Sequence, residues 1–293
     1  MDFKNAKELL DFCQKLNCPI SDIMKQRECT LAETSLEDIY AKMDHALSIM
    51  RESASSPIQE PKKSIGGLIG GEARLADLHR ARGAAICGSV LSRAITYSMA
   101  VLETNTSMGL IVAAPTAGSS GIVPGLLLAR QEEYSIPDSR VIDALFNAGA
   151  IGYLAMRNAT VAGAVGGCQA EVGVASAMAA SAAVELMGGT AKQCLNAASS
   201  VLMNLLGLVC DPLGGLVECP CQGRNAAGAA VALTAAELAL SGIRQLIPFD
   251  EMLAAMYRVG RQLSPDLRET ALGGCAATPT GKALGCRACP CSP

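Results

Sequence analysis

Long Ala-, Leu- and Val-rich segments of helical length, separated by glycine-containing breaks, fill this sequence from Ala73 onward. Strands are typically runs of β-branched and aromatic residues with a two-residue period, and such runs are nearly absent here. Residues 65–69 and 110–114 are the only weak candidates. The pattern predicts an all-α, mainly helical protein with a single large domain whose Gly-rich loops surround a buried site.

Local signals divide the chain into four predicted segments. Residues 1–51 are expected to form a helical hairpin, in which Thr34 and Glu37 make a capping box before a stripe of apolar residues at helical spacing. The other three segments are a polar linker with a Gly-rich loop (52–72), the main helical domain that carries the site (73–284) and a Cys-rich tail (285–293).

Composition excludes several classes of function. The chain has 293 residues, 50% of them hydrophobic, and can bury a large core without disulfides. Its formal net charge is −3, and it has no extended basic run, no Trp, five Tyr and four Phe. Nucleic-acid binding needs a basic surface or aromatic platforms, so we expect none.

The most apolar stretches predict buried helices and not membrane spans. Residues 172–187 and 226–243 consist mostly of Ala and Gly, carry Glu185 and Glu237, and lack a sustained Leu, Ile or Phe run of spanning length. The first residues do not resemble a signal peptide, and the thirteen cysteines are an odd number. We therefore expect a cytoplasmic protein with reduced thiols and no membrane partner.

Three cysteines at broken turns predict a metal centre. Cys168 follows two glycines, Cys210 precedes Asp-Pro-Leu-Gly-Gly, and Cys221 ends Cys-Pro-Cys. Three thiolates are one short of a closed tetrahedral set, and a cubane cluster held by three thiolates has one iron free for substrate. Inert buried thiols are the alternative, and spacing alone does not separate Cys221 from Cys219.

Polar residues near these turns are candidates for substrate binding. The loop 114–124 precedes an expected helix from Gly121 to Glu132, so free N–H groups and the hydroxyls of Ser119 and Ser120 would converge on an anion. A helix N-cap without a ligand is the alternative. Arg224 and Asn225 offer further donors, although Arg224 could instead pair with Glu218 or with a backbone carbonyl.

Two features near the C-terminus are open to several interpretations. Lys282 ends a hydroxyl-rich loop and could bind a carboxylate or support proton transfer, but an exposed lysine is the more ordinary interpretation. The tail cysteines Cys286, Cys289 and Cys291 could form a second metal clip, supply a ligand to the open iron, or be mobile thiols, and we favour mobile thiols.

Taken together, these segments resemble the α chain of the bacterial iron–sulfur-dependent L-serine dehydratases, from about residue 5 to residue 284. The resemblance implies a mostly helical catalytic chain with a [4Fe–4S] cluster on Cys168, Cys210 and Cys221, and it disfavours Cys219, where the family usually has an aliphatic residue. Ser120, where many relatives have cysteine, Cys219, Cys275 and the tail depart from the family pattern. The resemblance is carried by residues 114–125, 167–173, 204–212, 256–260 and 269–274.

The same resemblance implies L-serine as substrate and a separate β subunit. The family's Ser-Ser-Ser-His-Thr segment is absent from this sequence, whose only histidines are His45 and His79, so a histidine base would come from the partner. The expected reaction gives pyruvate and ammonia, with the open iron as Lewis acid on the hydroxyl and with Ser119, Ser120, Arg224 and Asn225 on the carboxylate.

Two rival functions are kept. One is an iron–sulfur lyase acting on cysteine or another β-substituted amino acid, and the other is a helical subunit that a metal merely stabilises. A pyridoxal phosphate enzyme is disfavoured, because no lysine lies in a recognisable Schiff-base context with a phosphate loop.

Overall fold

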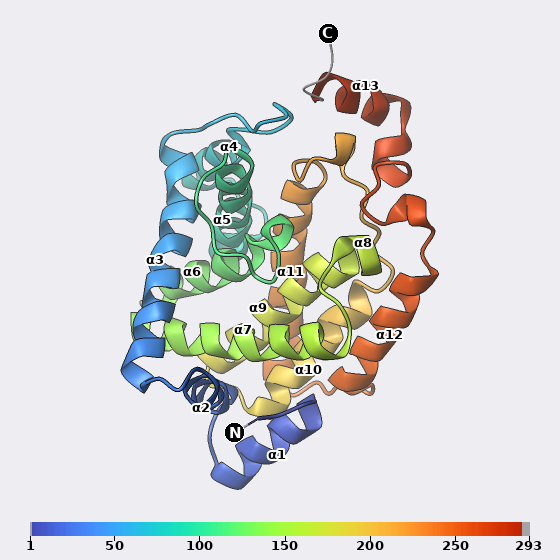
Figure 1. Ribbon diagram of the computed structural model, residues 1–293. Coiled ribbons are helices and arrows are strands. Elements are labelled where there is room, and N and C mark those ends of the chain that lie inside the picture. Colours follow the sequence, from blue (N-terminus) through green and yellow to red (C-terminus); the bar gives the residue numbers. More distant parts are fainter. Residues whose placement is uncertain (1, 289–293) are drawn as a thin grey trace.

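The computed structural model describes residues 2–288, and within them the chain forms thirteen α-helices and no β-strand. The predicted all-α fold is therefore confirmed, and the two weak strand candidates are loops (Figure 1). The helices are α1 (Ala6–Leu16), α2 (Ile20–Ala32), α3 (Leu36–Gln59), α4 (Glu72–Ala81), α5 (Gly88–Thr106), α6 (Ile122–Tyr134), α7 (Asp138–Asn158), α8 (Gly163–Gly166), α9 (Val174–Leu186), α10 (Ala191–Asn204), α11 (Cys221–Leu240), α12 (Phe249–Gln262) and α13 (Pro279–Ala288).

Helix α9 is the centre of the core. All of its residues are buried, and α6, α7, α10 and α11 pack around it. Its sequence is dominated by Ala and Ser, and such small side chains let the neighbouring helix backbones approach closely. No helix among residues 2–288 is both long and apolar enough to cross a membrane.

The cap of helix α3 differs by one residue from the expected one. Ser35, and not Thr34, is the N-cap, and its hydroxyl accepts a hydrogen bond from the Asp38 amide while the Asp38 carboxylate accepts one from the Ser35 amide. The predicted pair Thr34 and Glu37 is therefore wrong. Thr34 contributes in another way, because its hydroxyl donates to the same Asp38 carboxylate at 2.8 Å.

Helix α3 continues through Pro57 to Gln59 and so crosses the expected linker boundary at residue 51. Proline has no N–H, and the carbonyl of Ser53, four residues earlier, loses its helical partner. The hydroxyl of Thr104 on α5 donates to that carbonyl at 2.8 Å. A residue distant in sequence thus compensates for the proline inside the helix. The division of the chain into four segments stays a prediction.

Two groups of elements flank the region where the three cysteines meet. Figure 1 shows α3, α4 and α5 on one side and α12 and α13 on the other, with α8 and the start of α11 between them. Short turns complete this region: 3-10 turns at Ala117–Ser119, Leu213–Gly215 and Gly274–Ala277, and a π-helical turn at Gln169–Gly173.

Candidate active site

The fold brings the three predicted cysteine ligands together from three separate segments. Cys168 immediately precedes the π-helical turn, Cys210 lies in an extended segment after α10, and Cys221 is the first residue of α11. All three are buried. Cys219 is only half-buried, and Cys275 is exposed.

Hydrogen bonding and charge distinguish the three thiols. A hydrogen bond from Cys210 holds the pKa of Cys168 below its ordinary value despite burial, and the nearby Arg224 guanidinium acts in the same direction. The same hydrogen bond, together with burial, raises the pKa of Cys210. Burial raises the pKa of Cys221 to about 12, and the proximity of Cys168 adds to this shift. Cys168 is thus the thiol most readily ionised.

A glycine before Cys168 and a glutamine after it fix the position of this thiol. Gly167 has φ +75°, and a Cβ on it would lie 2.8 Å from the Leu208 carbonyl oxygen. The Gln169 side chain donates to the carbonyls of Gly166 and Met256 and accepts from the Gly207 amide. The π-helical turn that follows is a form often found at functional sites.

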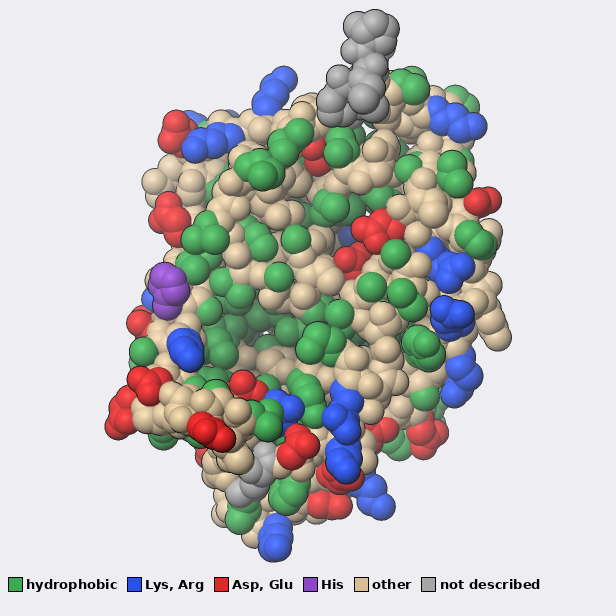
Figure 2. Space-filling model, viewed as in Figure 1, with side chains coloured by type: hydrophobic (Ala, Val, Ile, Leu, Met, Phe, Trp, Pro, Cys, Tyr) green, Lys and Arg blue, Asp and Glu red, His purple; other side chains and the backbone are tan. Residues whose placement is uncertain are grey.

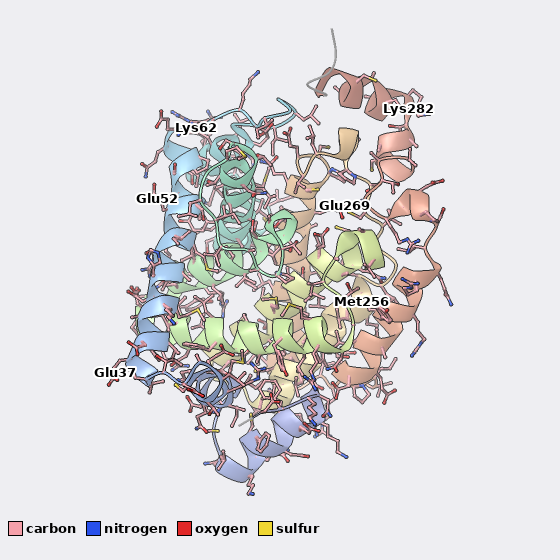
Figure 3. The ribbon with its side chains drawn as sticks, in the orientation of Figure 1. Glu37, Glu52, Lys62, Met256, Glu269 and Lys282 are labelled. Carbon is pink, nitrogen blue, oxygen red and sulfur yellow. The ribbon has the colours of Figure 1, made fainter. Side chains whose placement is uncertain are left out.

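Cys210 is held by the segment that follows α12. Its N–H donates to the Leu267 carbonyl at 2.9 Å, and its carbonyl accepts from the Glu269 N–H at 2.7 Å. Glu269 has φ +65°, a left-handed conformation that is uncommon outside glycine. Figure 3 shows Glu269 above helix α8, and in the same part of the face Figure 2 shows acidic side chains gathered beside a hollow.

Arg224 forms the charged link between the cysteine segments. One guanidinium nitrogen donates to the Val209 carbonyl at 2.8 Å, and another is paired with the Asp211 carboxylate at 2.7 Å. Burial opposes ionisation of Asp211, but the Cys275 N–H and Arg224 outweigh it and lower the pKa of that carboxyl. Two alternative partners were considered for Arg224, a backbone carbonyl and Glu218. The structure shows the first, the Val209 carbonyl, and Glu218 instead accepts from residues 64–68.

Glu171 and Thr116 belong to the same site, although the sequence did not single out either as a catalytic residue. A Glu171 oxygen lies 3.8 Å from the Cys210 sulfur, and its other oxygen accepts from the Thr116 hydroxyl at 2.8 Å. Burial raises the pKa of Glu171. Its position three residues after Cys168 was the available signal, because residues three apart share a helix face.

A glycine makes room beside this carboxylate. A Cβ on Gly163 would lie 2.5 Å from a Glu171 oxygen and 3.1 Å from the Cys210 sulfur. Only glycine therefore allows the backbone of α8 to approach the thiol and the carboxylate together.

The serine loop adjoins the site through hydrogen bonds. Ser119 and Ser120 are fully buried; the Ser119 hydroxyl lies 3.1 Å from that of Thr116, and the Ser120 hydroxyl donates to the Ala117 carbonyl. Asn225 accepts from the Gly121 N–H and donates to the carbonyls of Gly118 and Cys221. Asn225 thus fastens the serine loop to the start of α11.

Lys282 lies apart from these groups. It is exposed on α13, where Figure 3 shows it at the edge of the molecule. Cys286 is exposed on the same helix, whereas Cys289 and Cys291 lie outside the described residues. The proposed roles of Lys282 and of the tail stay predictions.

No group of three or more His, Cys, Asp or Glu side chains among residues 2–288 lies close enough together to hold a single metal ion. Cys168 is instead hydrogen-bonded to Cys210, and Cys221 lies near enough to Cys168 for that thiol to raise the pKa of Cys221.

Comparisons with known proteins identify the family of this chain. The family model described as serine dehydratase alpha chain matches residues 15–276. The chain is 46% identical over 282 residues to a probable L-serine dehydratase alpha chain of Bacillus subtilis, covering 96% of this chain and 94% of that one. It is 42% identical over 279 residues to the L-serine dehydratase alpha chain of Peptoniphilus asaccharolyticus, covering 95% and 96%. An L-serine dehydratase of Helicobacter pylori is 36% identical over 287 residues, covering 94% of this chain and 62% of the relative. The chain belongs to the serine dehydratase alpha chain family.

Proposed function

We propose that this chain converts L-serine to pyruvate and ammonia, as one chain of a two-chain enzyme with a [4Fe–4S] cluster on Cys168, Cys210 and Cys221. Family membership supports the reaction, because the relatives are named L-serine dehydratases. The observation that supports the cofactor is the meeting of three buried thiols from three segments, where Cys210 and Arg224 lower the pKa of Cys168.

The donor set suits an iron–sulfur cluster. Thiolates are the usual ligands of such clusters, and hydrogen bonds to sulfur tune them. Arg224 and the Cys210 thiol both act on the Cys168 sulfur. A [4Fe–4S] cluster with three protein ligands supplies a Lewis acid at its fourth iron, which helps the poor hydroxyl leaving group of serine.

The chain's own residues would bind and orient the substrate around that group. Glu171 can hold a proton at the carboxylate oxygen near Cys210, because its buried position favours the protonated form. The Thr116 hydroxyl orients the other Glu171 oxygen, and the Ser119 hydroxyl lies next to that of Thr116. Ser119, Ser120 and Arg224 keep their proposed place on the carboxylate side, and Asn225 supports that side by fastening the serine loop to α11. Lys282 keeps its proposed role in carboxylate binding or proton transfer.

A β subunit would complete the enzyme. Two relatives are named as alpha chains, and the Helicobacter pylori L-serine dehydratase is longer than this chain, which covers 62% of it. We propose that a partner with the Ser-Ser-Ser-His-Thr segment supplies a histidine base, since His45 and His79 are the only histidines here. A reducing cytoplasm suits both the cluster and the thirteen cysteines.

An anaerobic assay tests the proposal. The chain, prepared without oxygen beside its β subunit, should contain iron and inorganic sulfide and release pyruvate when L-serine is added. Colourless protein without sulfide that still forms pyruvate would refute the cofactor. Parallel assays of ammonia release from serine, threonine and cysteine decide between a serine dehydratase and a lyase for other β-substituted amino acids.

A further inference from the structure

A glycine-rich loop, residues 64–73, is joined to the turn around Cys221 by two buried carboxylates, Glu103 and Glu218. We infer that these carboxylates position Cys221: they close a ring of hydrogen bonds through the loop that fixes this thiol and leaves the placement of Cys168 and Cys210 to other contacts. The functional meaning rests on the cluster proposed above.

Glu218 binds the first part of the loop. Glu218 is only 2% exposed, and both of its carboxylate oxygens accept hydrogen bonds. Oε1 accepts from the Gly66 N–H at 2.6 Å, and Oε2 accepts from the Ser64 hydroxyl at 2.6 Å and from the Leu68 N–H at 3.0 Å. Glu218 is three residues before Cys221, and its carbonyl accepts from the Gln222 N–H at 3.0 Å.

Glu103 binds the last part of the loop from helix α5. Glu103 is 1% exposed, and both of its carboxylate oxygens also accept hydrogen bonds. Oε2 accepts from the Gly71 N–H at 3.1 Å, while Oε1 accepts from the Ala73 N–H at 2.8 Å and from the Gln222 side-chain amide at 2.9 Å. Gln222 directly follows Cys221, so the ring closes on both sides of this thiol.

The loop backbone is built for this close approach. A Cβ on Gly66 would lie 2.8 Å from Glu218 Oε1 and 2.3 Å from a Leu216 methyl carbon. Gly70 has φ +141°, and its Cβ would meet the Lys62 carbonyl oxygen at 2.6 Å. Any larger residue at either position would push the loop away from the carboxylates.

The other two thiols are held differently. Cys168 is placed by Gly167 and by the Gln169 side chain, and Cys210 by its pairing with residues 267–269. Loosening the ring should therefore affect Cys221 selectively. A general loss of stability would affect all three thiols.

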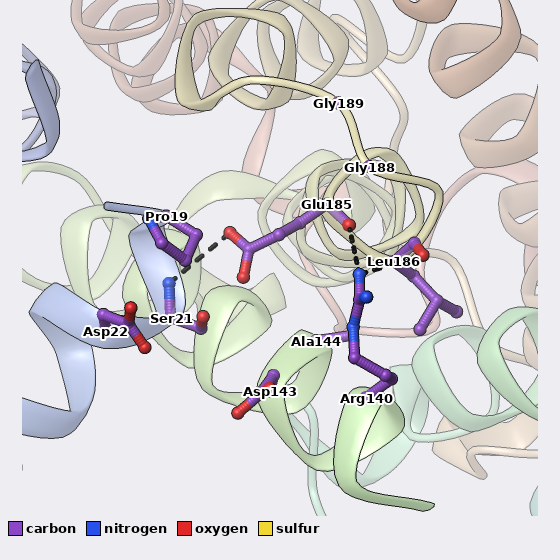
Figure 4. Close-up of a pocket in the computed structure, with 10 residues that line it drawn as sticks. All are labelled: Pro19, Ser21, Asp22, Arg140, Asp143, Ala144, Glu185, Leu186, Gly188 and Gly189. Carbon is purple, nitrogen blue, oxygen red and sulfur yellow. Dashed lines mark hydrogen bonds between the residues drawn. The ribbon is translucent and has the colours of Figure 1, made fainter. Parts of the chain in front are cut away.

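Glu103→Gln and Glu218→Gln are the informative variants. In both residues each carboxylate oxygen accepts a hydrogen bond. The glutamine replaces one of these oxygens with an NH2 group, which then faces an N–H or O–H donor and cannot accept from it. Glu185→Gln is the matched control, since Glu185 is a buried carboxylate that likewise accepts from two backbone amides and one side-chain amide. All three of these bonds fall on Oε2, so the glutamine oxygen can keep them. Figure 4 shows the bond from the Ser21 amide.

The measurement uses the full chain without metal. Alkylation of each thiol is followed by mass spectrometry, and hydrogen exchange is followed at the amides of Gly66, Leu68, Gly71 and Ala73. In both ring variants Cys221 should be alkylated about fivefold faster, a factor of the size expected for one lost hydrogen bond. Cys168 and Cys210 should keep their rates, and the control should match the wild type at all three thiols.

Several outcomes would overturn the inference. Equal acceleration at all three thiols would indicate general destabilisation, and faster loop exchange without faster Cys221 alkylation would mean that the carboxylates hold only the loop. If the ring variants do not fold, Gln222→Ala decides the question. It cuts only the link from Glu103 to the Cys221 turn and should speed Cys221 alkylation without changing exchange at Gly66 and Leu68; an unchanged alkylation rate would refute the ring.

A double variant adds a second criterion. If the ring acts as one unit, Glu103→Gln and Glu218→Gln together should accelerate Cys221 alkylation little more than either alone. Multiplying effects would show two independent contacts and contradict the ring. None of these readouts needs iron or serine, so they can succeed or fail independently of the proposed dehydratase activity.

Discussion

Buried side chains at this site are satisfied mainly by backbone groups. Asp211 is paired with Arg224 through one oxygen and accepts from the Cys275 N–H at 2.6 Å through the other. A Cβ on Gly274 would lie 2.1 Å from that second oxygen, so glycine is required beside it. Such residues cannot be exchanged singly without leaving a buried polar group unpaired.

Replacement of each proposed ligand should remove the cluster. In Cys168→Ala, Cys210→Ala and Cys221→Ala, purified without oxygen beside the β subunit, we expect iron and sulfide to fall severalfold and pyruvate formation to fall by about two orders of magnitude or more. Cys219→Ala is the matched control in the same turn and should keep its iron. Full iron and turnover in any of the three ligand variants would exclude that cysteine as a ligand.

Arg224→Lys should lower kcat/KM for L-serine by about tenfold or more. A lysine ammonium cannot keep the Val209 carbonyl, the Asp211 carboxylate and the Cys168 thiol together as the planar guanidinium does. Steady-state kinetics measure the effect, with Arg74→Lys on the exposed face of α4 as control. An unchanged kcat/KM would remove Arg224 from the site.

The meeting of the three thiols was predictable, whereas the positions of most of their neighbours were not. Cys168, Cys210 and Cys221 stand out because glycine or proline breaks the chain beside them. Thr116 meets Glu171 only because the serine loop folds back over the π-helical turn, a contact across 55 residues that no local pattern encodes. Asn225, expected on substrate, is occupied with backbone groups of its own chain.

Helices in this chain are specified partly by contacts outside themselves. The sequence predicted a linker from residue 52, but Ser53, Ala54 and Pro57 are buried in the continuing helix α3. The Thr104 hydroxyl compensates for the missing proline N–H, and this compensation becomes visible only when α3 packs on α5. The all-α class could be predicted from the composition and from the glycine-containing breaks, whereas the end of helix α3 at Gln59 could not.

Two helix glycines should respond oppositely to a methyl group. In α6, a Cβ on Gly125 would lie 2.1 Å from the Ser98 hydroxyl oxygen, so Gly125→Ala should cost about 1–3 kcal/mol of unfolding free energy. In α7, a Cβ on Gly149 would make only an ordinary 3.8 Å contact with Met24, so Gly149→Ala should stabilise by about 0.5–1 kcal/mol. Urea denaturation measures both, and a stabilising Gly125→Ala would contradict the close packing of α5 on α6.

A buried carboxylate helps to join the N-terminal helices to the central core. Glu185, at the end of α9, accepts from the amides of Ile20 and Ser21 at the start of α2 and from Asn147 on α7. This group borders a cavity of about 440 Å³ (Figure 4). Glu185 therefore adds a buried contact to the ion pair that already joins Lys25 of α2 to Asp143 of α7.

Glu185 should make stability depend on pH. Burial raises its pKa above the ordinary 4.5, so the folded state holds the proton more tightly than the unfolded state. Its contribution is fully present below the ordinary value and is lost as the pH rises through the raised pKa. In urea denaturation across this range, Glu185→Gln should therefore gain stability relative to the wild type as the pH increases; parallel curves would contradict this assignment.

The pairing of Cys210 with residues 267–269 has a consequence for biosynthesis. A ribosome releases Cys168, Cys210 and Cys221 before it makes the strand-like partner that holds the second of them. In the growing chain, Cys210 consequently lacks both of these backbone hydrogen bonds until translation has passed Glu269. In the proposed enzyme, a cluster would find all three thiols fixed only at this late stage of synthesis.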